Sequence, residues 1–199
     1  MSFLQGKLSA LVLCATAFVF CNPARAELVT NGGFETGDFT GWTQTGNTGF
    51  AGVQAPGPGP TVHGGNASAF FGPIGAVGGI SQNLATTPGT LYRIDLFMLP
   101  DGGTPSAFSV TFGGITLTSL TDLPASSSFN EFTFLVTASL ANTALGINFR
   151  DDPGFMFLDD VSVNPAAVPL PAALPPFASG GALLGFLGWR RKRKAIVTA

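Results

Sequence analysis

The sequence predicts an all-β fold for residues 27–165: an antiparallel β-sandwich of the jelly-roll type, flanked by an N-terminal signal helix and a C-terminal transmembrane helix. Two observations lead to it. Short runs rich in β-branched and aromatic residues recur between turns that contain Gly, Pro and Asp, with little helical periodicity. Side chains also alternate, with Tyr92, Ile94, Leu96 and Met98 on one face of a predicted strand. About eight to ten short strands in such a length favour two packed sheets.

Each predicted strand is a β-type run bounded by turn residues. The runs are 67–71, 79–84, 91–99, 108–112, 115–120, 129–137, 144–150 and 155–163. Segment 54–60 (QAPGPGP) is predicted to be an exposed loop, because Pro cannot donate to a central sheet ladder. Segment 72–79 is predicted to be a turn, and 164–167 a short linker to the tail.

The N-terminus has the pattern of a secretory signal peptide, residues 1–26. Lys7 precedes an apolar run at 8–20, and Ala24 and Ala26 place small residues where a signal peptidase cuts. We expect cleavage after Ala26. The alternative, a retained anchor, is less favoured because the apolar run is shorter than the ~20 residues that span a bilayer.

The charges are few and segregated. Charged residues make up 10% of the chain, against about 25% in ordinary soluble domains. Segment 27–165 contains all eleven acidic residues but only two basic ones, Arg93 and Arg150, so its net charge is −9. Such a surface repels phosphate backbones, which argues against nucleic-acid binding. It suits cations or a neutral ligand such as a glycan.

The side chains of 27–165 offer little for catalysis. Cys14 and Cys21 both lie in the leader, which excludes a disulfide, a thiol enzyme or a Cys-ligated zinc site in the mature chain. His63 is the only histidine and lies in a predicted surface loop. The pairs Asp151-Asp152 and Asp159-Asp160 could supply the two carboxylates of a glycosidase, but segment 151–154 (DDPG) is more typical of a turn. The sequence therefore predicts no catalytic residues and a non-enzymatic protein.

The tail, residues 168–195, combines a proline-rich entry, a short apolar stretch and five consecutive cations. From Pro175 to Trp189 a helix would span about 22 Å, less than the ~30 Å hydrocarbon core. The cations hold their end in the cytoplasm by the positive-inside rule, which places 27–165 across the membrane. They are Arg190, Arg191, Lys192, Arg193 and Lys194. A permanent anchor and a patch for acidic lipids both remain open.

This tail resembles the C-terminal sorting signal of PEP-CTERM proteins in its VPLPA variant. The signature is Val168-Pro169-Leu170-Pro171-Ala172, followed by the apolar stretch and the basic cluster in the order of that family. The resemblance implies export across the inner membrane of a Gram-negative bacterium and transient anchoring by the tail. It also implies recognition by an exosortase, followed by removal of the tail and release or attachment at the cell surface.

Three stretches of the domain resemble the jelly rolls of carbohydrate-binding modules and galactose-binding-like domains: 28–46 (LVTNGGFETGDFTGWTQTG), 81–98 and 155–163 (FMFLDDVSV). The resemblance implies a structural calcium held by Glu35 and Asp159, with Asp160 as the alternate; these carboxylates could instead be solvated or hydrogen-bonded in turns. Trp42 could stack on a sugar or pack against the sandwich. We expect a structural or adhesive role at the cell surface or in extracellular polymer; the alternative is a module that recognises exopolysaccharide.

The tail analysis makes a direct prediction about the mature protein. Intact mass spectrometry of the protein isolated from its native host should give a mass below that of residues 27–199, because the sorting tail is removed. A mass that matches 27–199 would rule out removal of the tail.

Overall fold

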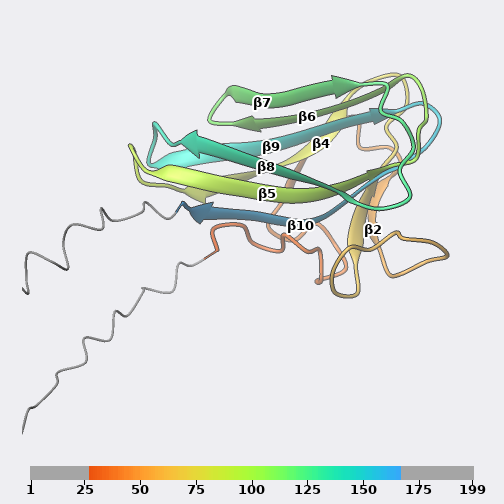
Figure 1. The fold of residues 1–199 in the computed structure, drawn as a ribbon, viewed down its shortest axis with the longest axis horizontal. Coiled ribbons are helices and arrows are strands. Elements are labelled where there is room, and N and C mark those ends of the chain that lie inside the picture. The colour runs from red at the N-terminus through yellow and green to blue at the C-terminus, as the bar shows by residue number, and fades with distance from the viewer. Residues whose placement is uncertain (1–26, 167–199) are drawn as a thin grey trace, which may run out of the picture.

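The computed structural model describes residues 27–166, which form ten β-strands in two packed sheets (Figure 1). The predicted signal peptide and the sorting tail, with its VPLPA motif and basic cluster, lie outside the described residues. No helix within residues 27–166 has the length and hydrophobicity to cross a membrane. The strands are β1 Thr43–Gly46, β2 Ala51–Gln54, β3 Ser68–Phe71, β4 Gly78–Ala85, β5 Leu91–Pro100, β6 Ser106–Phe112, β7 Ile115–Thr121, β8 Asn130–Thr137, β9 Asn142–Asp151 and β10 Met156–Pro165.

Both sheets are five-stranded and every pairing is antiparallel. The first sheet has the order β1-β4-β9-β6-β7 and the second has the order β2-β3-β10-β5-β8. Only β2–β3 and β6–β7 are neighbours both in sequence and in a sheet; the other connections cross from one sheet to the other. This is the connectivity of a jelly roll, so the predicted fold class is confirmed.

The predicted strands correspond to β3 through β10, and the differences lie at edges and ends. The short strands β1 and β2 were not predicted, because four residues give too few alternating positions to recognise. Gln54 was placed in a loop but pairs with Ser68 as the last residue of β2. Asn164, predicted to begin a linker, pairs with Arg93 in β10. These corrections follow from pairing with distant strands, which local sequence does not encode.

The core lies between the sheets and is built from alternating positions on each strand. Ile94, Leu96 and Met98 of β5 are fully buried, as are Leu145, Ile147 and Phe149 of β9. The Phe71 and Phe149 rings stack across the interface between the sheets, with centroids 4.2 Å apart and planes inclined by 4°. Burial of each such side chain contributes roughly 1.5–3 kcal/mol, so the core is the main source of stability.

The opening segment runs along the last strand (Figure 1). The Leu28 N–H donates to the Val163 carbonyl at 3.2 Å. The Glu27 carboxylate accepts from the Val163 N–H at 2.6 Å and from the Asn164 side chain at 2.7 Å. The first and last described residues are therefore held together without a disulfide.

The core stack predicts a large loss on truncation. Phe149→Ala should lower the free energy of unfolding of residues 27–166 by about 3–5 kcal/mol, because it leaves a cavity between the sheets. Urea denaturation measures the change. Leu135→Ala, at a side chain 63% exposed on β8, should change it by less than about 0.5 kcal/mol; equal losses would contradict the assignment of the core.

Candidate functional site

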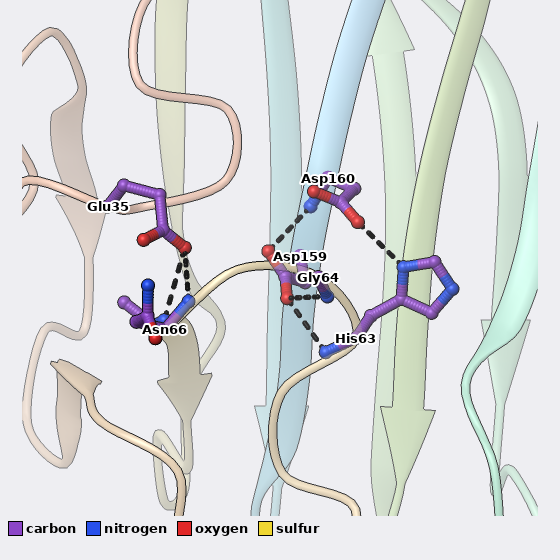
Figure 2. Close-up of polar contacts among 7 residues, drawn as sticks. Glu35, His63, Gly64, Asn66, Asp159 and Asp160 are labelled. Atoms are coloured by element: carbon purple, nitrogen blue, oxygen red, sulfur yellow. Dashed lines mark hydrogen bonds and ion pairs between the residues drawn. The ribbon is translucent and has the colours of Figure 1, made fainter.

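A buried carboxylate in β10 holds a loop from the other half of the chain. Asp159 is 0% exposed. Its Oδ2 accepts from the backbone N–H groups of His63 at 2.8 Å and Gly64 at 3.0 Å, and its Oδ1 accepts from the Asp160 N–H at 2.8 Å (Figure 2). The loop that connects β2 to β3 is thus held against β10 by hydrogen bonds to Asp159.

A β-bulge in β10 puts both aspartates beside this loop. The register with β5 shifts between Asp159 and Ser162, and Asp160 has a φ of 47°. A strand without a bulge would point neighbouring side chains to opposite faces. Here the Asp160 Oδ2 instead reaches the His63 Nδ1 at 2.7 Å. Nothing in the order of residues 155–163 marks the bulge.

Glu35 holds the next residues of the same loop, just before β3. Its Oε1 accepts from the backbone N–H groups of Asn66 at 2.8 Å and Ala67 at 3.2 Å (Figure 2). The structure therefore brings together the three carboxylates that the sequence singled out, and it shows that they share one loop.

Burial sets the electrostatics of Asp159. Burial raises the pKa of this carboxyl; the N–H bonds from Gly64, His63 and Asp160 oppose the shift, and the Asp160 charge adds to it. The charged form of Asp159 therefore depends on these amides, and the loop depends in turn on Asp159.

Calcium at Glu35, Asp159 and Asp160 stays a prediction. Backbone N–H groups already bond to one Glu35 oxygen and both Asp159 oxygens. Within residues 27–166 no three His, Cys, Asp or Glu side chains form a group arranged to hold a metal ion. A calcium here would need backbone carbonyls for most of its ligands.

His63 links the loop to the outer face of the second sheet. Its ring stacks on Phe97 of β5, with centroids 3.7 Å apart and planes inclined by 13°. The Phe129 ring meets it edge-on at 5.5 Å. The predicted surface histidine is thus a 35% exposed side chain held between Asp160 and two aromatic rings.

Beside this stack the outer face is hollowed. The cavity has a volume of about 400 Å³. It is lined by Glu27, Gly33, Arg93, Asp95, Phe97, Glu131, Asp160, Val161 and Ser162. Its floor comes from β5, β8 and β10, so it lies over the middle of the sheet and not at a loop end.

The polar side chains of this hollow form one network. Arg93 Nε lies 2.8 Å from Asp95 Oδ2, and Arg93 Nη2 lies 3.7 Å from Glu131 Oε1. Thr133 on β8, directly opposite Asp95, donates its hydroxyl to Asp95 at 2.7 Å. The alternation of 92–98 already placed Arg93, Asp95 and Phe97 on the face away from the core, but only the β5–β8 register added Glu131 and Thr133.

Trp42 lies in the core. It is 8% exposed, stacks on Phe34 with centroids 6.0 Å apart, and donates its Nε1–H to the Asn31 carbonyl at 3.1 Å. This placement favours packing over sugar stacking, the two alternatives that the sequence left open, because neither ring face is open to a ligand.

The Asp151-Asp152 pair does not line the hollow. Asp152 bonds to Arg150 at 2.6 Å and begins the turn into β10. Asp151, predicted to be part of that turn, is instead the last residue of β9 and is 0% exposed. Burial raises its pKa to about 7, with the neighbouring Asp101 as the next largest cause.

The folded domain is similar to solved structures of known function. A carbohydrate-binding module of family 61, solved in complex with β-1,4-galactotriose, is 18% identical with a TM-score of 0.60 over 71% of this chain and 99% of that one. The described domain has the jelly-roll fold of carbohydrate-binding modules. The enzymatically active domain of bacteriophage CBA120 tailspike protein 4 is 16% identical with a TM-score of 0.52 over 70% of this chain and 21% of that one.

The similarity extends no further than the fold. The xylan-binding family 22 module of Paenibacillus barcinonensis Xyn10C is 16% identical, with a TM-score of 0.47 over 73% of this chain and 97% of that one. No family model matches the sequence, and no curated protein matches it. The TM-scores of 0.60 and 0.52 show a shared fold, and identities of 16% and 18% leave the ligand to be argued from the site.

The bonds of Asp159 predict a specific loss of stability. Asp159→Ala should lower the free energy of unfolding by about 3 kcal/mol, because three backbone N–H groups lose a charged acceptor. Chemical denaturation of residues 27–166 in EDTA measures this loss without any contribution from calcium. Asp160→Ala is the matched control and should cost much less.

A Glu35 variant tests the predicted calcium. If Glu35 and Asp159 hold the ion, adding calcium should raise the melting temperature of the parent by more than that of Glu35→Gln. An equal response of the two proteins would remove calcium from this site and leave the carboxylates as hydrogen-bond acceptors alone.

Proposed function

We propose that residues 27–166 bind a glycan chain in the hollow on the outer face of the second sheet, without catalysing a reaction. The observation that carries the proposal is the composition of this hollow. It combines the Phe97 ring with carboxylate, guanidinium and hydroxyl groups in a cavity of about 400 Å³. Binding sites for small ligands typically join apolar surface to a few placed polar groups in this way.

The polar groups suit the hydroxyls of a sugar. Asp95 and Glu131 accept hydrogen bonds, Arg93 donates them, and both kinds are held in place by their mutual ion pairs. Four of the five charged residues that line the hollow are acidic. We therefore expect a neutral polysaccharide as the ligand, since uronic or sulfated chains would be repelled.

The fold supports the proposal at a coarser level. The family 61 module with a TM-score of 0.60 was solved with β-1,4-galactotriose bound. That ligand belongs to that protein. For this chain the fold says only that the scaffold is one on which sugar sites have been built.

The predicted processing signals indicate where the proposed glycan binding would take place. We propose that a signal peptidase removes residues 1–26 and that an exosortase recognises Val168–Ala172 and removes the tail. A glycan-binding domain delivered in this way would act as an adhesive or structural component at the cell surface or in extracellular polymer, such as a biofilm matrix. The support for this step is the order of motif, apolar stretch and basic cluster in the sequence.

The test is a glycan array on residues 27–166, which hold both sheets and the whole core, followed by calorimetry with the best ligand. Arg93→Ala and Glu131→Ala should each weaken binding by about tenfold or more, since each removes a hydrogen-bonding partner of the sugar. Both side chains are on the surface, so the fold should survive.

The matched control is Asn83→Ala, an exposed side chain on β4 of the opposite sheet. It should leave the affinity unchanged. Loss of binding in Asn83→Ala with full binding in Arg93→Ala would move the site to the other sheet. Absence of binding to any glycan would leave a purely structural role, and release of sugar products would make the protein a hydrolase.

A further inference from the structure

A second pair of carboxylates lies at one end of the sandwich, away from the Asp159 loop. Asp151 ends β9 and Asp101 directly follows β5. Asp151 is 0% exposed, and both of its carboxylate oxygens lack a hydrogen-bond partner among the described residues. No other buried side-chain oxygen or nitrogen in residues 27–166 is left in this way.

Burying a charged carboxylate without a hydrogen-bond or charge partner lowers the stability of the folded state. A folded protein avoids the cost by pairing the charge, by neutralising it with a proton or by coordinating a metal. Asp159 shows the first solution, because three N–H groups bond to its oxygens. Asp151 receives no such donor, so its charge has to be balanced by something other than the backbone.

Oxygens from two connecting segments converge beside Gly103. The Asp101 Oδ1 accepts from the Gly103 N–H at 2.9 Å, and the Asp101 Oδ2 accepts from the Phe155 N–H at 2.7 Å. A Cβ on Gly103 would collide with Asp151 Oδ1 and would lie 2.6 Å from the Pro153 carbonyl oxygen. The missing side chain thus leaves room for the Asp151 carboxylate and the Pro153 carbonyl beside Gly103, whose N–H bonds to Asp101.

The neighbouring Asp152 is already satisfied. Its carboxylate bonds to Arg150 and to the Gly75 N–H. This contrast separates Asp152 from the cluster and makes it a natural control.

We propose that Asp101 and Asp151 bind a divalent cation of the calcium type, with backbone carbonyls such as that of Pro153 and water as further ligands. Calcium accepts six to eight hard oxygen ligands in adaptable geometry, which suits two carboxylates and loop carbonyls. Two negative charges would balance the ion. The site has only two acidic side chains. Groups of three or more His, Cys, Asp or Glu side chains that could hold a metal ion do not occur in residues 27–166.

The ion would tie the β5–β6 connection to the β9–β10 connection. These segments leave different sheets, β5 in the second and β9 in the first. A bound cation would therefore link the two sheets at this end of the sandwich. The site shares no residue with the Glu35–Asp159 cluster or with the glycan hollow.

The test uses the full chain in a mild detergent, freed of metal with EDTA and titrated with calcium chloride by calorimetry and by thermal melts. Asp151→Asn should remove one binding event. It should also remove the associated rise in Tm, about 10 °C at calcium one hundred times above its Kd. Asp101→Asn should do the same, which guards against a folding defect peculiar to one variant.

Two controls separate this site from others. Asp152→Asn and Glu35→Gln should each retain the binding event that Asp151→Asn loses. If Asp151→Asn binds calcium with the stoichiometry and Tm rise of the parent, or if the parent binds none, the proposal is overturned. Asp151 would then carry a proton shared with Asp101.

Discussion

The outer face of this protein depends on one buried carboxylate. Asp159 bonds to the N–H groups of His63 and Gly64, so it fixes the β2–β3 loop on β10. In this loop the His63 ring stacks on Phe97. The same ring contacts Asp160, which lines the hollow. Without that anchor the loop would keep only the Glu35 bonds to Asn66 and Ala67 and the contacts of the His63 ring. Residues 27–166 contain no cysteine, so hydrogen bonds to carboxylates take the place that disulfides have in many small domains.

Carboxylates are used in three different ways in one acidic domain. Asp159 is buried and satisfied by backbone donors, so it organises structure. Asp95 and Glu131 lie at the surface around Arg93, where they remain available to a ligand. Asp151 is buried and receives no backbone donor, so its charge has to be neutralised by a proton or balanced by a cation. The net charge of −9 in residues 27–165 therefore describes functional groups and not only a solvated surface.

Some of these features could be read from local sequence. The alternation of Tyr92, Ile94, Leu96 and Met98 predicted a half-buried strand, and it correctly put Arg93, Asp95 and Phe97 on the opposite face. The family resemblance grouped Glu35 with Asp159 and Asp160 as calcium ligands; the structure places all three against the β2–β3 loop, and the calcium stays a prediction. The edge strands β1 and β2 were not predicted, because four residues show too little alternation to be recognised as a strand. Asp151 was misplaced in a turn because a DDPG sequence favours a turn, although the strand pairing ends only after its first residue.

The sequence by itself determined the fold class, because a period of two in apolar residues requires sheets with one buried face. It also determined the charge balance, since this depends on composition alone, and the order of residues in the leader and tail predicts the processing signals. Only the tertiary structure decided which polar groups meet. The β5–β8 register joined Glu131 and Thr133 to Arg93 and Asp95, and the bulge in β10 turned two aspartates toward one loop. Such encounters depend on contacts between residues far apart in the chain, which no local pattern specifies.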